Sequence, residues 1–268
     1  MPPIIYGTAW KKEQTKDLVI QAIKAGFKGI DTACQPKHYN EAGVGEALEL
    51  LKREGYRRNE IFVQTKFTPL EGQDPDSIPY EKDANLQTQV AQSFEVSKTN
   101  LKTDYVDSLV LHSPLFPYKD LLRVWRAMEA ISKKGQARQL GISNTYDLGT
   151  LERLYEDAEL KPSVLQNRFY KDSGYDKEIR AWCKQHDVRY QSFWTLTANP
   201  HILQSRELFD LSRRYDKNVA QLFFAYLHQI GITPLTGTCD LEHMQDDIRS
   251  FDIRLSDAEI ASLNRLFE

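Results

Sequence analysis

The sequence predicts a (β/α)₈ barrel, the TIM-barrel fold, formed as one domain over residues 1–268. Short runs rich in β-branched residues alternate with longer amphipathic stretches from one end of the chain to the other, which is typical of an α/β protein with a parallel sheet. Eight such units fit into 268 residues, and no linker or change in composition divides them. A closed barrel therefore explains the chain better than two open sheets.

The elements follow in order along the chain. Eight strands are expected at residues 4–8, 28–31, 61–66, 106–112, 136–143, 164–167, 188–193 and 232–236. Helices are expected at residues 13–25, 41–53, 85–101, 118–133, 147–158, 176–185, 205–215, 219–228, 243–249 and 256–267. Gly26 ends the first helix, and a long polar loop at 68–83 separates the third strand from its helix.

An open doubly wound sheet is the alternative fold, but its dinucleotide fingerprint is missing. Gly43 and Gly45 begin a helix, yet Leu48 stands where a third glycine is needed. No apolar strand runs directly into these glycines, and no Gly-Lys-Ser/Thr phosphate loop occurs. We therefore reject the open sheet.

Charge and cysteine content exclude several classes of function. Lys and Arg number 35 against 38 Asp and Glu, so the net charge of −3 offers nothing to attract nucleic acid or an anionic membrane. Cys34, Cys183 and Cys239 form no Cys-x-x-Cys pair, so we expect buried or half-buried free thiols and no metal site. The N-terminus lacks the features of a signal peptide, and polar residues interrupt the apolar stretch at 219–235. We therefore expect a cytoplasmic protein.

In a barrel, functional side chains gather at the carboxyl ends of the strands. The second, third and fourth strands end in Asp31, Lys66 and His112, which places an acid, a lysine and a histidine on three adjacent strands at one rim. Singly, these residues could form a structural ion pair and a satisfied core histidine, and Ser143-Asn144 could cap a helix. Their coincidence at one rim favours an active site.

The set suits the activation of a neighbouring phenol. A tyrosine with its ordinary pKa near 10 is a poor acid or base at neutral pH unless a cation lies close to it. A lysine held by a carboxylate favours the phenolate, and a neutral histidine can donate a hydrogen bond to a carbonyl. Tyr39, in the loop after the second strand, is the candidate phenol.

Several spaced motifs resemble those of the aldo-keto reductases, and together they cover almost the whole chain. The first motif is Asp31-Thr32-Ala33 followed by Tyr39-Asn40-Glu41 and Val44-Gly45. The others are Thr65-Lys66, Leu109 to Pro114, Leu140-Gly141-Ile142-Ser143-Asn144, and Phe251-Asp252-Ile253-Arg254-Leu255-Ser256.

The resemblance implies reduction of an aldehyde or ketone by NADPH, with NADH also possible. It implies a catalytic tetrad of Asp31, Tyr39, Lys66 and His112, with Tyr39 as the proton donor. The cofactor-binding residues that we assign are Thr8, Asp31, Ser143, Asn144, Gln166, Phe193, Trp194, Thr195, Leu196, Thr197, Thr236, Gly237, Thr238, His243 and Asp247. Ser143, Asn144 and Gln166 would hold the nicotinamide carboxamide, and Phe193 would stack on its ring. An aromatic substrate pocket is expected from Trp10, Phe67, Tyr80 and Phe116, with loop 68–83 as part of its roof.

The chain departs from the family pattern in two places that matter. Tyr39 lies eight residues after Asp31 and directly before Asn40, so His38 stands where the tyrosine would be counted back from Asn40. We assign Tyr39, because His38 has no hydroxyl. After the eighth strand, the lysine and arginine that usually meet the 2′-phosphate are replaced by Gly237 (or Leu235 in another alignment) and His243. Asp247 replaces an asparagine there, so we expect weaker preference for NADPH over NADH than the family shows.

Two other functions stay open at this point. The barrel could keep the cofactor and serve a regulatory role without turnover, or Lys66 could form a Schiff base as in a lysine aldolase. Asp31 argues against the aldolase, because it would keep Lys66 charged. For the reductase, we expect a small carbonyl compound as the substrate and a monomer or weak homo-oligomer.

Overall fold

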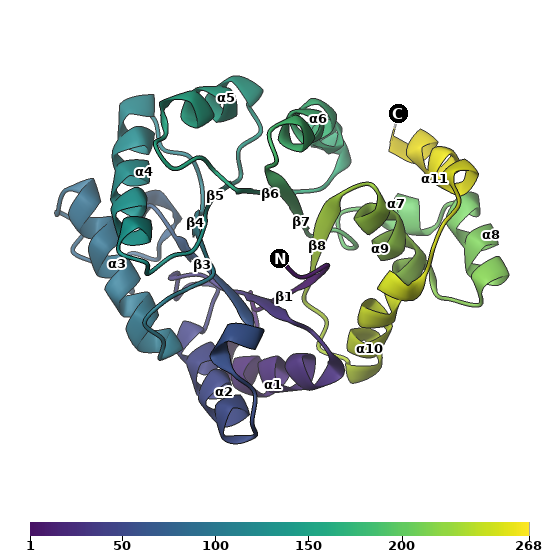
Figure 1. The fold of residues 1–268 in the computed structure, drawn as a ribbon, viewed down its shortest axis with the longest axis horizontal. Coiled ribbons are helices and arrows are strands. Elements are labelled where there is room, and N and C mark those ends of the chain that lie inside the picture. The colour runs from purple at the N-terminus through teal and green to yellow at the C-terminus, as the bar shows by residue number, and fades with distance from the viewer. Residues whose placement is uncertain (268) are drawn as a thin grey trace.

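The computed structural model describes residues 1–267, and its eight parallel strands close into a barrel (Figure 1). The strands are β1 Ile5–Gly7, β2 Gly29–Asp31, β3 Phe62–Phe67, β4 Ser108–Leu111, β5 Leu140–Ser143, β6 Val164–Arg168, β7 Arg189–Phe193 and β8 Ile232–Thr236. Each strand pairs with the next one in the sequence, and β8 pairs with β1 to close the ring. The predicted (β/α)₈ fold is confirmed.

Helices follow the strands much as the periodicity predicts. They are α1 Thr15–Ala25, α2 Glu41–Arg53, α3 Leu86–Leu101, α4 Tyr118–Lys133, α5 Leu148–Asp157, α6 Lys177–Gln185, α7 Pro200–Leu203, α8 Arg206–Tyr215, α9 Val219–Gln229, α10 Leu241–Arg249 and α11 Asp257–Asn264. Only the four-residue α7 has no counterpart in the prediction. The longest helices, α3 and α4, have 16 residues each, and within residues 1–267 none is both long and apolar enough to cross a membrane.

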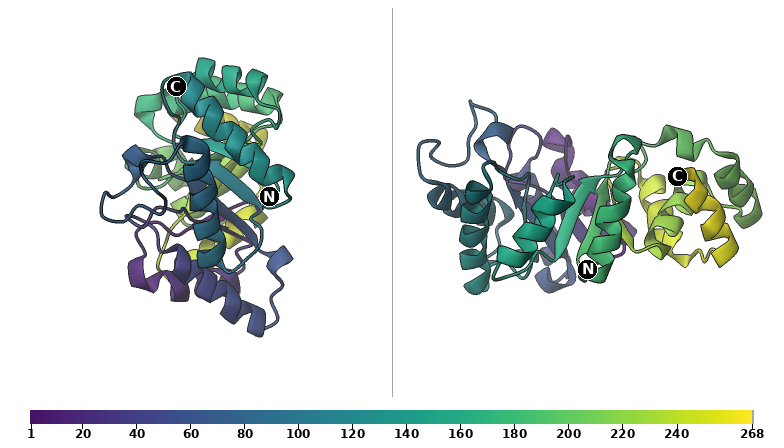
Figure 2. Two further views of the ribbon diagram at one scale, coloured as in Figure 1. Left: turned by 90° about the vertical axis from the view of Figure 1, so that its left-hand side faces the viewer. Right: turned by 90° about the horizontal axis from the view of Figure 1, so that it is seen from above.

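Two helices lie outside the ring of helices that covers the barrel. In Figure 1, α8 and α11 lie side by side beyond α9, and the right-hand view of Figure 2 shows that they extend the molecule on this side. The eight strands and the other helices form the rest of the molecule. The rim that carries the functional residues is therefore formed by the barrel itself and its strand-to-helix loops.

The inside of the barrel is polar. Alternation along the strands sends Gln64, Gln166 and Gln191 inward from β3, β6 and β7. The amide of Gln64 exchanges two hydrogen bonds with that of Gln191, at 2.8 and 3.1 Å, and Nε2 of Gln166 donates to Oε1 of Gln191 at 2.9 Å. All three side chains are buried, so these mutual bonds replace those that water would make.

Gly45 explains the glycine pair that opens α2. A Cβ atom at this position would overlap the backbone carbonyl of Asn100 at the end of α3. The glycine therefore permits close packing of α2 on α3 and has no part in binding a dinucleotide.

The cysteines follow the prediction in two of three cases. Cys34 and Cys183 are buried free thiols, as expected. Cys239 is exposed, and the prediction for it was wrong. It lies in the turn between β8 and α10, where its side chain contacts Lys11 at the surface.

Candidate active site

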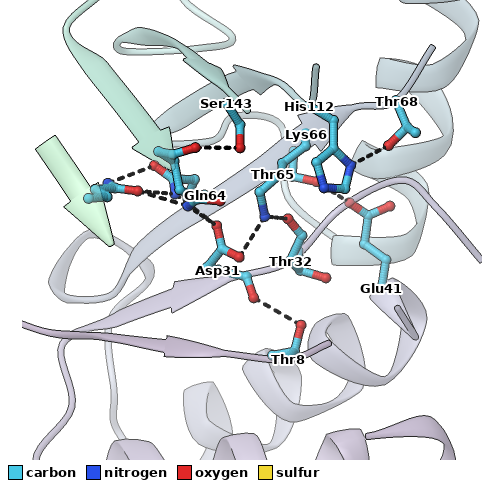
Figure 3. Close-up of polar contacts among 12 residues, drawn as sticks. Thr8, Asp31, Thr32, Glu41, Gln64, Thr65, Lys66, Thr68, His112 and Ser143 are labelled. Atoms are coloured by element: carbon cyan, nitrogen blue, oxygen red, sulfur yellow. Dashed lines mark hydrogen bonds and ion pairs between the residues drawn. The ribbon is translucent and has the colours of Figure 1, made fainter. Parts of the chain in front are cut away.

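A buried ion pair lies at the carboxyl ends of β2 and β3. Nζ of Lys66 lies 2.5 Å from Oδ2 of Asp31 and donates to the carbonyl of Thr32 at 2.9 Å (Figure 3). Gln64 and Gln166 donate to the other carboxylate oxygen, Oδ1, at 2.8 and 3.0 Å. Every oxygen of this carboxylate is therefore paired, which is the condition under which a buried ion pair is tolerated.

The environment keeps Lys66 charged. Burial alone would lower the pKa of its ammonium group, but the charge of Asp31, together with the Tyr39 hydroxyl, outweighs this effect and raises it. Lys66 is therefore a fixed cation and not a free amine.

Tyr39 reaches this cation from a tight turn. The backbone amides of His38 and Tyr39 both donate to the carbonyl of Gln35, at 3.1 and 3.0 Å, and this turn takes up the extra length of the loop. Nζ of Lys66 lies 5.1 Å from the centre of the Tyr39 ring, and the ring of His112 meets it edge to face with centroids 6.0 Å apart. The structure thus brings Asp31, Lys66, Tyr39 and His112 together, as the sequence predicts.

The electrostatics of Tyr39 differ from the expectation. Burial raises the pKa of its hydroxyl, and the nearby charge of Lys66 opposes this effect without reversing it. The phenol therefore stays protonated at neutral pH. This state suits a proton donor better than a base.

His38 lies away from the ion pair. Its ring stacks on Trp10 with centroids 3.8 Å apart, and its carbonyl accepts a hydrogen bond from the Trp10 backbone at 2.7 Å. Burial lowers the pKa of its imidazole. Of the two candidates in this loop, Tyr39 is the one whose ring lies beside Lys66.

His112 follows β4 and is neutral. Its backbone amide donates to the carbonyl of Phe67 at 2.9 Å, and its Nδ1 lies 2.7 Å from the hydroxyl of Thr68. Burial, with the charges of Lys66 and His38, holds the pKa of His112 well below its ordinary value. When Thr68 donates to Nδ1, the ring proton is on Nε2.

The residues assigned to the nicotinamide lie at the ends of β5, β6 and β7, but one points elsewhere. Asn144 has a positive φ of 55°, and its side chain donates to the carbonyl of His112 at 2.8 Å. Ser143 donates to the carbonyl of Gln166 at 2.6 Å, and Phe193 is partly exposed at the rim. The amide nitrogen of Gln166 donates to Asp31 at 3.0 Å and to Gln191 at 2.9 Å, inside the barrel. This position was expected to contact a carboxamide; here its amide nitrogen serves the ion pair.

Two further assigned segments meet the rim mainly through their backbone. Thr8 is buried, and its hydroxyl donates to the carbonyl of Asp31 at 2.9 Å. Thr195 is buried and bonds Ser192 at 2.9 Å, Leu196 packs against the core, and the hydroxyl of Thr197 donates to the Trp194 carbonyl at 3.4 Å. This loop therefore leaves its backbone to line the rim, as the sequence suggests.

The end of β8 holds a buried carboxyl group. The hydroxyl of Thr236 donates to Oδ2 of Asp247 at 2.8 Å, and burial raises the pKa of Asp247 to about 7. His243 is exposed on the first turn of α10, and the carbonyl of Thr238 accepts a hydrogen bond from Tyr6 at 2.9 Å.

Lys11, which the sequence analysis missed, lies over this same segment. Its ammonium donates to the carbonyl of Gly237 and contacts Sγ of Cys239 at 3.3 Å. Gly237 and Lys11 are in close contact, since a Cβ at Gly237 would lie 3.6 Å from Nζ, an ordinary van der Waals distance. Within residues 1–267, Lys11 forms no ion pair with a carboxylate. The signal was present in the topology: β1 pairs with β8, so the loop after β1 must lie beside the end of β8.

The four residues predicted to form the aromatic pocket differ in exposure. Trp10 and Phe116 are exposed, by 58% and 73%. Phe67 and Tyr80 are buried against each other, with ring centroids 5.7 Å apart, and the Tyr80 hydroxyl donates to the carbonyl of Thr68 at 2.9 Å. Phe67 faces outward because it directly follows the inward-pointing Lys66 on β3. Tyr80 thus anchors loop 68–83, of which it is a part, to Phe67 and to the Thr68 carbonyl.

Comparison with known proteins gives a consistent result. The family model described as "Aldo/keto reductase family" matches residues 3–268. Glyoxal reductase of Bacillus subtilis is 30% identical over 254 residues, covering 94% of this chain and 83% of the relative. Methylglyoxal reductase of Yersinia pestis is 24% identical, covering 95% and 84%.

Solved structures show the same fold. An aldo-keto reductase from a deep-sea metagenome superposes with a TM-score of 0.83 at 24% identity, covering 99% of this chain and 91% of that one. An aldo-keto reductase of Bombyx mori in complex with NADP gives a TM-score of 0.82 at 23% identity, covering 99% and 89%. The chain therefore belongs to the aldo/keto reductase family, and its activity is the NAD(P)H-dependent reduction of a carbonyl compound.

Proposed function

We propose that Tyr39, Lys66, Asp31 and His112 carry out this reduction, with Tyr39 as the proton donor. One observation carries the proposal: a single ammonium group, that of Lys66, is fixed by the Asp31 carboxylate on one side and faces the Tyr39 ring on the other. A neutral His112 stands beside that ring. No other tyrosine ring of residues 1–267 lies over the Lys66 ammonium.

The residues present fit a nicotinamide dinucleotide. Lys11 offers a cation without a carboxylate partner in the described part of the chain, which suits a phosphate. Phe193 at the end of β7 offers a partly exposed ring for a flat heterocycle, and Ser143 and Asn144 offer polar atoms at the end of β5. Bound NAD(P)H supplies the hydride.

The protein's own part in the reaction is to orient the carbonyl and to move one proton. Nε2 of His112 donates a hydrogen bond to the carbonyl oxygen and holds it beside Tyr39. The Tyr39 hydroxyl then gives its proton to that oxygen as negative charge develops there. The Lys66 cation stabilises the phenolate that remains, and Asp31 with its amide partners keeps Lys66 in place.

Small aldehydes are the substrates that we propose first. The relatives named above are a glyoxal reductase and a methylglyoxal reductase, and both act on short dicarbonyl compounds by name. A panel of aldehydes and ketones, each assayed with NADPH and with NADH, tests the proposal. Turnover of none of them, by a protein that binds the cofactor, would favour the regulatory alternative.

The aldolase alternative is disfavoured by the charge of Lys66. A Schiff base requires a neutral amine, and Asp31 holds the ammonium at 2.5 Å. Borohydride trapping with a carbonyl ligand decides the matter, because a covalent adduct at Lys66 would support the aldolase.

The oligomeric state and compartment belong to the proposal as well. We propose a monomer or weak homo-oligomer in the cytoplasm. Sedimentation at several protein concentrations and fluorescence microscopy of a tagged chain test the two parts.

A further inference from the structure

Arg168, at the end of β6, is a cation at the mouth of the barrel that forms no ion pair with a carboxylate of residues 1–267. It is paired in register with Phe193 on β7. Arg168 lies two residues beyond Gln166 on the same strand. Its Cα is therefore about 7 Å nearer the rim than the Cα of Gln166, whose side chain donates to Asp31. Arg168 thus stands above the ion pair and beside the ring assigned to the nicotinamide.

Two aromatic rings hold its guanidinium. Cζ of Arg168 lies 4.4 Å from the centre of the Tyr170 ring and 4.7 Å from that of Trp194. Trp194 is 52% exposed, so the seat of Arg168, the position between the Tyr170 and Trp194 rings, is open to the mouth of the barrel. The backbone of Arg168 is also fixed, because its amide donates to the Tyr146 hydroxyl at 3.0 Å.

The hydrogen-bond donors of this guanidinium are unused. Nε is buried without a hydrogen-bond partner, and within residues 1–267 no carboxylate forms an ion pair with Arg168. A guanidinium has five N–H donors in a planar fork that matches a carboxylate or a phosphate. A buried donor without a partner is costly, so a position like this one calls for a ligand.

A second site in the same protein shows what completes such an arrangement. Arg58 and Arg138 each lie 4.3 Å from the ring of Tyr105. Both also pair with the carboxylate of Asp107, at 2.9 Å each. At Tyr105 the protein supplies its own anion, whereas the seat formed by Tyr170 and Trp194 has none from residues 1–267.

We propose that Arg168 binds an oxyanion, a carboxylate or a phosphate, at the mouth of the barrel. The anion is carried either by the carbonyl substrate, in which case the inference rests on the proposed function, or by the cofactor pyrophosphate. In the first case the protein prefers aldehydes that bear a negative charge over neutral ones of the same size.

Binding measurements separate these two sources without depending on turnover. Dissociation constants are measured for NADP⁺ and NAD⁺ by tryptophan fluorescence, and for 4-carboxybenzaldehyde and neutral 4-nitrobenzaldehyde on the NADP⁺ complex by calorimetry. The variants are Arg168→Met, Arg168→Lys and, as a matched control, Arg153→Met. Arg153 stacks on Tyr118 at 3.8 Å on an outer helix, so its loss changes the net charge equally. Melting curves establish that each variant is folded.

The expected result is a ten- to hundredfold weaker binding of one class of anion in Arg168→Met. A loss confined to 4-carboxybenzaldehyde assigns the substrate as the source, and an equal loss for NADP⁺ and NAD⁺ assigns the pyrophosphate. Arg168→Lys keeps the charge and recovers part of the affinity. All four constants within twofold of wild type, or the same losses in Arg153→Met, would overturn the proposal. The proposed function fails separately, if wild type binds the cofactor but reduces neither aldehyde.

Discussion

The proposed catalytic centre and the edge at β8 are built in opposite ways. Around Asp31 and Lys66, strand residues form a closed set of buried hydrogen bonds in which each charge has its partner. At the β8 edge, Lys11 donates to the Gly237 carbonyl and contacts the exposed thiol of Cys239. The nearby carboxyl of Asp247 has a pKa of about 7. The first region is organised before any ligand arrives. In the second region, the charge of Lys11 stays available for a ligand.

The largest effect is expected at the centre, from Tyr39→Phe. Removing the proposed proton donor beside Lys66 should lower the rate of reduction by about 10²–10⁴, since that is the usual contribution of general acid catalysis. The dissociation constant of NADP⁺ should stay within twofold, because Tyr39 is proposed to act on the substrate carbonyl and is not among the residues assigned to the cofactor. Single-turnover kinetics and fluorescence titration measure the two. If Tyr39→Phe keeps wild-type turnover while His38→Ala abolishes it, our assignment of the loop is wrong.

The second-largest effect is expected from Lys66→Met, which should lower the rate of reduction more than His112→Gln does. Lys66 lowers the pKa of Tyr39 and His112 does not carry a charge, so only the lysine variant should raise the apparent pKa above which reduction fails. The pH–rate profiles of both variants are the test.

The Lys66→Met variant leaves Asp31 buried without its cation, at a cost of about 3–5 kcal/mol in stability. Assays are therefore run well below its melting temperature, which is measured first. An apparent pKa that does not move in the folded variant would contradict the role given to Lys66.

At the β8 edge, Lys11→Met should weaken NADP⁺ binding about ten- to hundredfold, the usual worth of a charge-assisted hydrogen bond. The exposed neighbour Lys12→Met is the control of equal charge. A loss for NADP⁺ alone places the ammonium on the 2′-phosphate, and an equal loss for NAD⁺ places it on the pyrophosphate. Titrations indistinguishable from Lys12→Met would show that Lys11 only caps the Gly237 carbonyl.

The smallest effect is expected from Asp247→Asn. With a pKa of about 7, Asp247 is neutral at pH 6 and ionised at pH 8, where it should repel a 2′-phosphate. The variant should therefore raise the ratio of NADP⁺ to NAD⁺ affinity several-fold at pH 8 and hardly at pH 6. Equal ratios at both pH values would remove Asp247 from the cofactor site.

The same carboxyl predicts a change in stability with pH. Its folded pKa lies above the value near 3.9 of an unfolded aspartate, so wild type binds the extra proton only when folded. The contribution of Asp247 to the free energy of unfolding is fully present below about pH 4, and it is lost as the pH rises to about 7. Urea unfolding of wild type and Asp247→Asn between pH 5 and 8 measures this loss, which the variant should not show.

The sequence predicts the first region better than the second for a physical reason. Asp31, Lys66 and His112 end strands, and strand order alone places them together at one rim. The contacts of Lys11 and Arg168 depend on the conformation of loops and rings, and no linear spacing shows that Lys11 lies on the Gly237 carbonyl. The sequence prediction placed both Lys66 and Phe67 at the site, although adjacent strand residues face opposite sides.

The glutamine amides inside the barrel have a consequence for how protons travel. An amide has no group that titrates near neutral pH, and Gln64, Gln166 and Gln191 occupy the interior below Asp31. They hold the carboxylate in place yet offer no carrier for a proton toward the opposite end of the barrel. The glutamine layer is thus polar, but its side chains do not carry protons. In the proposed mechanism, Tyr39 is therefore reprotonated after each turnover from the mouth of the barrel, by the same route that substrate and product use.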